Sequence, residues 1–128
     1  MRLLLDTHVA LWAVSEPEAL SAAARAAIVG AEEIRLSVVS PWELLIKAAL
    51  GRLVLHRPVE EICRELEREF GVQSLAVTFP HVLAVGRLAA HHGDPFDRLL
   101  IAQASVEGLA IVTRDRLFGA YGPELVHA

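Results

Sequence analysis

Short apolar runs alternate along this chain with segments of helical length, and this alternation constrains the fold more than any other feature. The predicted strands are residues 2–6, 34–37, 75–78 and 109–112, with a short edge strand at 125–126. The predicted helices are residues 7–14, 21–29, 40–50, 58–70, 80–90 and 94–107. Such alternation is typical of a parallel sheet with helices on both faces. We therefore predict a three-layer α/β fold, in which a mainly parallel central sheet is flanked by helices.

Two of the helix starts have the same sequence pattern. Ser40 is the predicted N-cap, Pro41 the first helical residue and Glu43 the third, where its side chain can bond back to the cap. Asp94 and Pro95 repeat the pattern, which assigns Asp94 to the N-cap of the last long helix. Both helices are therefore expected to begin at a polar cap followed by proline.

Length and composition exclude several classes of protein. We expect residues 1–128 to form a single domain, large enough to bury a core without disulfide bonds. No apolar stretch reaches the length of about 18 residues that spans a bilayer, and Asp6 interrupts the only N-terminal apolar run, so neither a membrane segment nor a signal peptide is predicted. The single cysteine, Cys63, favours a reducing cytoplasm. The net charge of -4 disfavours a protein that coats nucleic acid, but not a nuclease with an acidic site.

The chain has only four aspartates, and their positions are unusual. Asp6 and Asp115 each follow an apolar run that is a predicted strand, whereas Asp94 and Asp97 begin an apolar helix. Loops at the carboxyl ends of parallel strands gather on one edge of a sheet. Carboxylates brought together there would repel one another unless a divalent cation neutralised them, so this edge is a candidate metal site.

The same acids also have structural interpretations, as helix caps or turn residues. Asp6 and Asp115 can serve as helix caps or turn residues, and capping alone explains Asp94. Asp97 is in line with the apolar stripe of its own helix, which indicates that it faces inward. Only Asp94 is therefore expected to act mainly as a cap.

Glu43 has two structural interpretations of its own: the capping box with Ser40, and an ion pair four residues along the helix with Lys47, the only lysine. The helix around them is apolar on nearly every side. Glu43 and Lys47 thus form a narrow polar stripe, which is more consistent with a cleft than with open solvent.

Other metal sites and other enzymes fit less well. The six histidines show no zinc-binding pattern; His91 and His92 are expected in an exposed loop, and His8 is near the aspartates but is not expected to bind the metal directly. Phosphatases with an aspartate nucleophile need a second aspartate where His8 stands. A receiver domain needs a lysine at a late strand end, whereas Lys47 lies in an early helix.

Taken together, these motifs resemble one known family. The segments LLLDTH (residues 3–8), SPWE (40–43) with Lys47 and LGRL (50–53), DPFDRLLIAQA (94–104), and TRD (113–115) with Phe118 resemble the PIN-domain proteins, and more narrowly the VapC-type toxins of toxin–antitoxin pairs. The resemblance covers nearly the whole chain in the right order. His8 is a departure, since many relatives carry a small polar residue there.

The resemblance implies a Mg²⁺- or Mn²⁺-dependent endoribonuclease with a central parallel sheet. Matched motif by motif, its metal-binding and catalytic acids fall on Asp6, Glu43, Asp97 and Asp115. It also implies a homodimer and a cognate antitoxin that blocks the acidic pocket. A PIN-like module that binds RNA or a protein without cutting is the alternative, although a degenerate site should have lost an acid.

Further residues near these acids have expected supporting roles. Thr7 and Thr113 would orient the carboxylates, and Asp94 would support the site or cap its helix. The candidate contacts to substrate phosphates are Arg98, Arg114 and Arg116.

Overall fold

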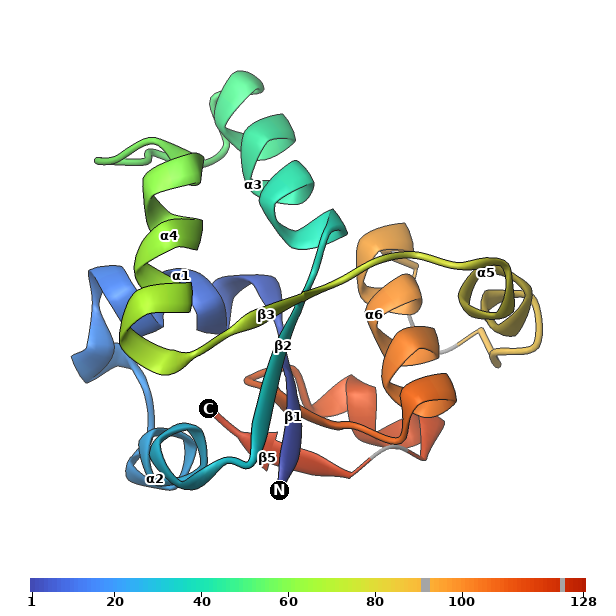
Figure 1. Ribbon diagram of the computed structural model, residues 1–128. Helices are drawn as coiled ribbons and strands as arrows, with labels where there is room; N and C mark the ends of the chain where they lie inside the picture. Colours follow the sequence, from blue (N-terminus) through green and yellow to red (C-terminus); the bar gives the residue numbers. More distant parts are fainter. Residues whose placement is uncertain (91–92, 123) are drawn as a thin grey trace.

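The computed structural model describes residues 1–90, 93–122 and 124–128. Within these residues, five strands form one sheet: β1 (Arg2–Leu5), β2 (Glu33–Ser37), β3 (Gln73–Leu75), β4 (Ala110–Thr113) and β5 (Leu125–His127). Their order is β3-β2-β1-β4-β5, and every neighbouring pair is parallel (Figure 1). The order reverses between β1 and β4, and ligands of open α/β sheets bind outside the carboxyl ends of the strands at such a reversal.

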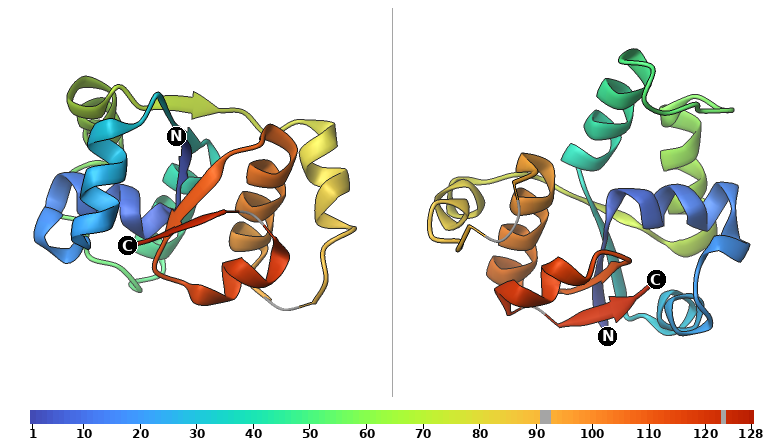
Figure 2. Two further views of the ribbon diagram at one scale, coloured as in Figure 1. Left: turned by 90° about the horizontal axis from the view of Figure 1, so that it is seen from below. Right: turned by 180° about the vertical axis from the view of Figure 1, so that it is seen from behind.

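Alternate residues of β1 belong to the two faces of the sheet. Leu3 and Leu5 lie in a core cluster with residues of α1 (Thr7–Ser15), α2 (Ala22–Gly30) and α4 (Val59–Phe70). Leu4 lies in a second cluster with residues of α6 (Pro95–Glu107) and of the 3-10 helix η2 (Arg116–Tyr121). Figures 1 and 2 show these two groups of helices on opposite sides of the sheet, with α5 (Phe79–Val85) packed outside α6. Burial on both faces explains the continuous run of leucines in β1.

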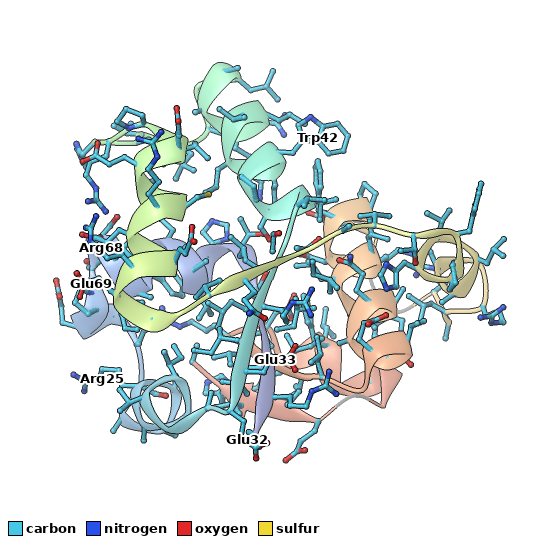
Figure 3. The ribbon with its side chains drawn as sticks, viewed as in Figure 1. Arg25, Glu32, Glu33, Trp42, Arg68 and Glu69 are labelled. Atoms are coloured by element: carbon cyan, nitrogen blue, oxygen red, sulfur yellow. The ribbon has the colours of Figure 1, made fainter. Side chains whose placement is uncertain are left out.

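The helix α3 (Val39–Ala49) follows β2 closely and packs against α1, α4 and α6. Its residues Val39 and Leu44 are buried. On its other side Trp42 is exposed and projects outward (Figure 3), and its ring meets the Phe96 ring edge-on at 5.3 Å between centroids. One side of α3 is therefore held in the core while the other reaches the surface.

The described helices are all short. A 3-10 helix, η1 (Pro17–Ala19), joins α1 to α2, and α6, the longest of the described helices, has 13 residues. In the part of the chain that the structure describes, no helix combines the length and the apolar character needed to cross a bilayer.

The predicted α/β architecture is confirmed, and every described strand pairing is parallel. Most predicted boundaries differ from the observed ones by one residue at most, and three predictions were further off. The strand predicted at 75–78 is Gln73–Leu75, and the helix predicted at 80–90 is Phe79–Val85. Ser40 is not an N-cap, because α3 already begins at Val39 and places Ser40 inside its first turn. The predicted loop at His91 and His92 lies outside the described residues.

Candidate active site

The four predicted acids line one cavity at the carboxyl edge of the sheet. Asp6 follows β1 and Asp115 follows β4, the two strands between which the sheet order reverses. Glu43 comes from α3 and Asp97 from the first turn of α6. The cavity has a volume of about 330 Å³ and is lined by Asp6, His8, Val9, Trp12, Glu43, Lys47, Asp97, Arg114 and Asp115. The fold thus brings together acids that are up to 109 positions apart in the sequence, from residue 6 to residue 115.

Asp6 is both a helix cap and a wall of this cavity. Its Oδ1 accepts a hydrogen bond of 2.7 Å from the Thr7 amide, as the N-cap of α1, and its Oδ2 accepts one of 2.8 Å from the Thr113 hydroxyl. Burial raises the pKa of Asp6 above its ordinary value of 3.8, although both hydrogen bonds act in the opposite direction. The two interpretations of Asp6 are therefore compatible, and its negative charge is only partly compensated.

This raised pKa predicts how the metal-free protein responds to pH. Because folded Asp6 holds its proton more tightly than the unfolded chain, its contribution to the free energy of unfolding is fully present below pH 3.8 and is lost as the pH rises through the folded pKa. Urea unfolding in EDTA, from about pH 3 to about pH 7, should show the wild type losing stability relative to Asp6→Asn as the pH rises. A difference that moved the other way would mean that the hydrogen bonds of Asp6 outweigh its burial.

Glu43 is held by a network of side chains and not by a helix cap. Only 2% of Glu43 is exposed; its Oε1 lies 2.8 Å from the Thr7 hydroxyl and its Oε2 lies 2.5 Å from Lys47 Nζ. The Thr7 hydroxyl is also 2.9 Å from the Ser40 hydroxyl. Thr7 has a single proton to donate and the Glu43 carboxylate can only accept, so Ser40 must donate to Thr7. The capping-box interpretation was wrong, whereas the prediction that Glu43 faces a cleft is confirmed.

Asp94 and Asp97 have different surroundings although they lie in one turn. Asp94 Oδ1 accepts hydrogen bonds from the amides of Phe96, at 2.8 Å, and Asp97, at 3.3 Å, which confirms Asp94 as the N-cap of α6. Asp97 is half-buried and lines the acidic cavity, whereas Asp94 is not among the lining residues.

Asp115 caps η2 in a similar way, with its Oδ1 2.9 Å from the Leu117 amide. Thr113 ties this turn to Asp6, because its hydroxyl accepts from the Asp115 amide at 3.0 Å while it donates to Asp6. Thr113 therefore holds two of the cavity acids in one arrangement, and it does so from a buried position at the end of β4.

The three candidate phosphate-binding arginines have different positions. Arg114 lines the cavity, with its guanidinium 4.1 Å from the centre of the Trp12 ring. It also donates to the main-chain carbonyls of Ala128, at 3.2 Å, and of Ala19. Arg98 lies outside the cavity lining and donates to carbonyls at the end of α5 and just beyond it, including that of Val85 at 3.2 Å. Arg116 is exposed at the start of η2 and is also outside the lining.

A metal site is not fully assembled in this conformation. Among residues 1–90, 93–122 and 124–128, no three carboxylate, imidazole or thiolate side chains stand close enough together to hold a metal ion. The chemistry of the donors nevertheless fits a hard divalent cation, since four carboxylates share the cavity and the buried charge of Asp6 lacks full compensation. Bringing three of these groups onto one ion therefore requires that at least one side chain rearranges.

Sequence reasoning missed two parts of this site. Ser40 was assigned to a helix cap, yet it lies three residues before Glu43 on the same face of α3, and that spacing would have been a signal. Trp12 was given no role. It lies one helical turn after His8, and both residues line the acidic cavity and a neighbouring hollow of about 690 Å³. His8 thus lies at the cavity wall, closer to the acids than the sequence indicated.

Comparison with known proteins agrees with this fold and identifies a family. The family model described as PIN domain matches residues 3–122. The DNA-bound VapBC structure from Salmonella typhimurium has a TM-score of 0.69 at 17% identity and covers 98% of this chain and 96% of that chain. VapBC2 from Rickettsia felis, bound to a DNA fragment from its promoter, has a TM-score of 0.67 at 14% identity. The match covers 98% of this chain and 97% of that chain. At such low identities, these two structures show a shared fold alone.

A closer similarity is found in sequence. The chain is 39% identical over 115 residues to Ribonuclease VapC22 of Mycobacterium tuberculosis (strain ATCC 25618 / H37Rv). The match covers 88% of this chain and 86% of the relative. The family model also extends over every acid that lines the cavity, from Asp6 to Asp115. The chain therefore belongs to the PIN-domain family, and within it to the VapC-type toxins.

Proposed function

We propose that this protein is a Mg²⁺- or Mn²⁺-dependent endoribonuclease, the toxin of a toxin–antitoxin pair, and that residues 1–128 act as one nuclease domain. The observation that carries the proposal is the single cavity shared by Asp6, Glu43, Asp97 and Asp115 at the reversal of the sheet order. The similarity to Ribonuclease VapC22 supports RNA as the substrate.

In this proposal the four acids hold the cation, and the neighbouring hydroxyl groups hold the acids. A bound divalent ion supplies positive charge against the anionic phosphate and makes water more acidic. Thr113 fixes Asp6 and the Asp115 turn, and Thr7 fixes Glu43. Carboxylates restrained in this way need little reorganisation when charge develops on the phosphate.

The proposed reaction is hydrolysis of one phosphodiester bond. A water oxygen bonds to phosphorus, the bond from phosphorus to the 3′ oxygen breaks, and a proton passes from the water to that oxygen. The products are a 5′-phosphate and a 3′-hydroxyl. Arg114 lines the cavity and is held by Trp12 and two carbonyls, and we propose that it contacts a substrate phosphate.

The partners are a cognate antitoxin and a second copy of the chain. The VapBC structures with the same fold support an antitoxin partner, which we propose inhibits the toxin by blocking the acidic cavity. We also propose a homodimer and a cytoplasmic location, the latter because Cys63 is a free thiol.

The proposal is tested by cleavage of total RNA with the purified protein. We expect cleavage with Mg²⁺ or Mn²⁺, a loss of about a hundredfold or more in EDTA, and recovery when excess metal is restored. Sequencing the newly formed 5′-phosphate ends would identify the target RNA. Undiminished cleavage in EDTA would contradict metal dependence, and RNA binding without cleavage at any metal concentration would favour a catalytically silent module.

A further inference from the structure

Both oxygens of the Glu43 carboxylate already have partners. Oε1 accepts from Thr7, which is 1% exposed and anchored at the start of α1, and Oε2 is paired with Lys47. A carboxylate oxygen has a second lone pair, so the neutral Thr7 hydroxyl can stay when Glu43 binds a cation, whereas the positive charge of the Lys47 ammonium would repel a divalent ion at Oε2. Thr7 is fixed in the core by its own contact with Ser40, whereas the Lys47 side chain is 28% exposed and ends in a flexible ammonium group. Lys47 is therefore the partner that can leave.

The Lys47 ammonium lies among the same acids that would hold the metal. It lines the acidic cavity and interacts electrostatically with Asp94 and Asp97 as well as with Glu43. A lysine ammonium is positively charged at neutral pH, and that of Lys47 is paired with the Glu43 carboxylate. A single positive charge thus partly neutralises the acids of the cavity.

We propose that Lys47 is the counter-ion of the metal-free site, and that a divalent cation must displace its ammonium group from Glu43 Oε2. This inference rests on the proposed metal-dependent function.

Two opposite effects follow from this role. Without the positive charge of Lys47, the metal-free acids would repel one another more strongly, so the metal-free protein would be less stable. The divalent cation would in turn no longer compete with a positive charge, and Coulomb's law for charges a few ångströms apart near a surface predicts binding about tenfold tighter or more. A residue that merely oriented Glu43 for the metal would give weaker binding when removed.

Mn²⁺ calorimetry and melting in EDTA test this proposal with variants of matched size. Lys47→Gln should bind Mn²⁺ about tenfold more tightly than wild type and melt at a lower temperature in EDTA, whereas Lys47→Arg should retain wild-type affinity within about threefold. The control is Arg64→Gln, which breaks the exposed pair of Arg64 with Glu60, also four residues apart, and should leave Mn²⁺ affinity unchanged. Equal or weaker Mn²⁺ binding by Lys47→Gln would overturn the proposal while leaving the metal site intact; no binding by any form would overturn both.

The wild type offers a second measurement, because Lys47 is the only lysine of the chain. Labelling lysine with ¹³C at Cε gives one side-chain signal from this sequence. Titration with Mg²⁺ should move that signal towards the position of free lysine, and the movement should saturate together with metal binding. A signal that stays in place while Mg²⁺ binds would overturn the proposal even if Lys47→Gln did not fold.

Discussion

Asp97→Asn is expected to reduce RNA cleavage by about a hundredfold to a thousandfold while the protein remains folded. Asp97 lines the acidic cavity from the first turn of α6, and asparagine keeps its shape but removes one negative charge from the proposed metal site. The loss of several kcal/mol of charge stabilisation corresponds to such a factor in rate. Initial rates at saturating Mn²⁺ would measure the loss of RNA cleavage, and melting temperatures in EDTA would show whether the variant remains folded.

The neighbouring aspartate provides a matched control. Asp94→Asn makes the same chemical change three residues away, but Asp94 caps α6 and does not line the cavity. Asparagine is also a good cap, so we expect a loss of stability of about 1 kcal/mol or less and little change in metal affinity. If Asp94→Asn abolished cleavage and Asp97→Asn did not, the assignment of the two residues would be reversed.

Phe118→Ala is expected to lower the free energy of unfolding by about 3 to 5 kcal/mol. Phe118 is fully buried, with 0% of its surface exposed, and packs in the core cluster that contains Leu4 and Ile111. It also secures η2, whose cap is Asp115, since the Phe118 amide donates to the Asp115 carbonyl at 3.3 Å. Truncation of this ring should therefore loosen the turn that carries one of the cavity acids.

Denaturant unfolding would measure this effect, and the adjacent residue provides its control. Leu117 is 52% exposed, so Leu117→Ala should change stability by no more than about 0.5 kcal/mol. Phe118→Leu, which keeps an apolar side chain, should fall between the two. Equal stability of Phe118→Ala and Leu117→Ala would show that η2 does not contribute to the core as its burial indicates.

The sheet could be predicted because each of its strands can be recognised from a short run of apolar residues. Runs such as Leu3 to Leu5 are apolar at every position, as expected for strands buried on both faces, and the direction of the chain follows from the helices between them. Boundaries were less predictable. Ser40 and Pro41 favour a helix start, yet tertiary packing buries Val39 and starts α3 two residues before Pro41, which turns Ser40 towards Thr7.

The acids of the site were predictable as a set, whereas their partners were not. Asp6 and Asp115 follow strands that the sequence reveals, so their meeting at one edge follows from the parallel sheet. The bond between Thr7 and Glu43 joins residues 36 positions apart, and no local pattern indicates it. The sequence likewise shows Lys47 one turn from Glu43, but only the burial of Glu43 reveals that their pair lies in a cavity.

The order of the strands divides the acidic site into two mechanically different halves. Asp6 and Asp115 extend from β1 and β4, adjacent strands flanked on both sides by others, so their main chain is braced within the sheet. Glu43 and Asp97 are carried by α3 and α6, which pack beside the sheet and lie outside its ladder of hydrogen bonds. In the proposed metal site, substitutions where α3 and α6 pack against their neighbours would alter the spacing between the halves, and with it the size of ion accepted, without changing any acid.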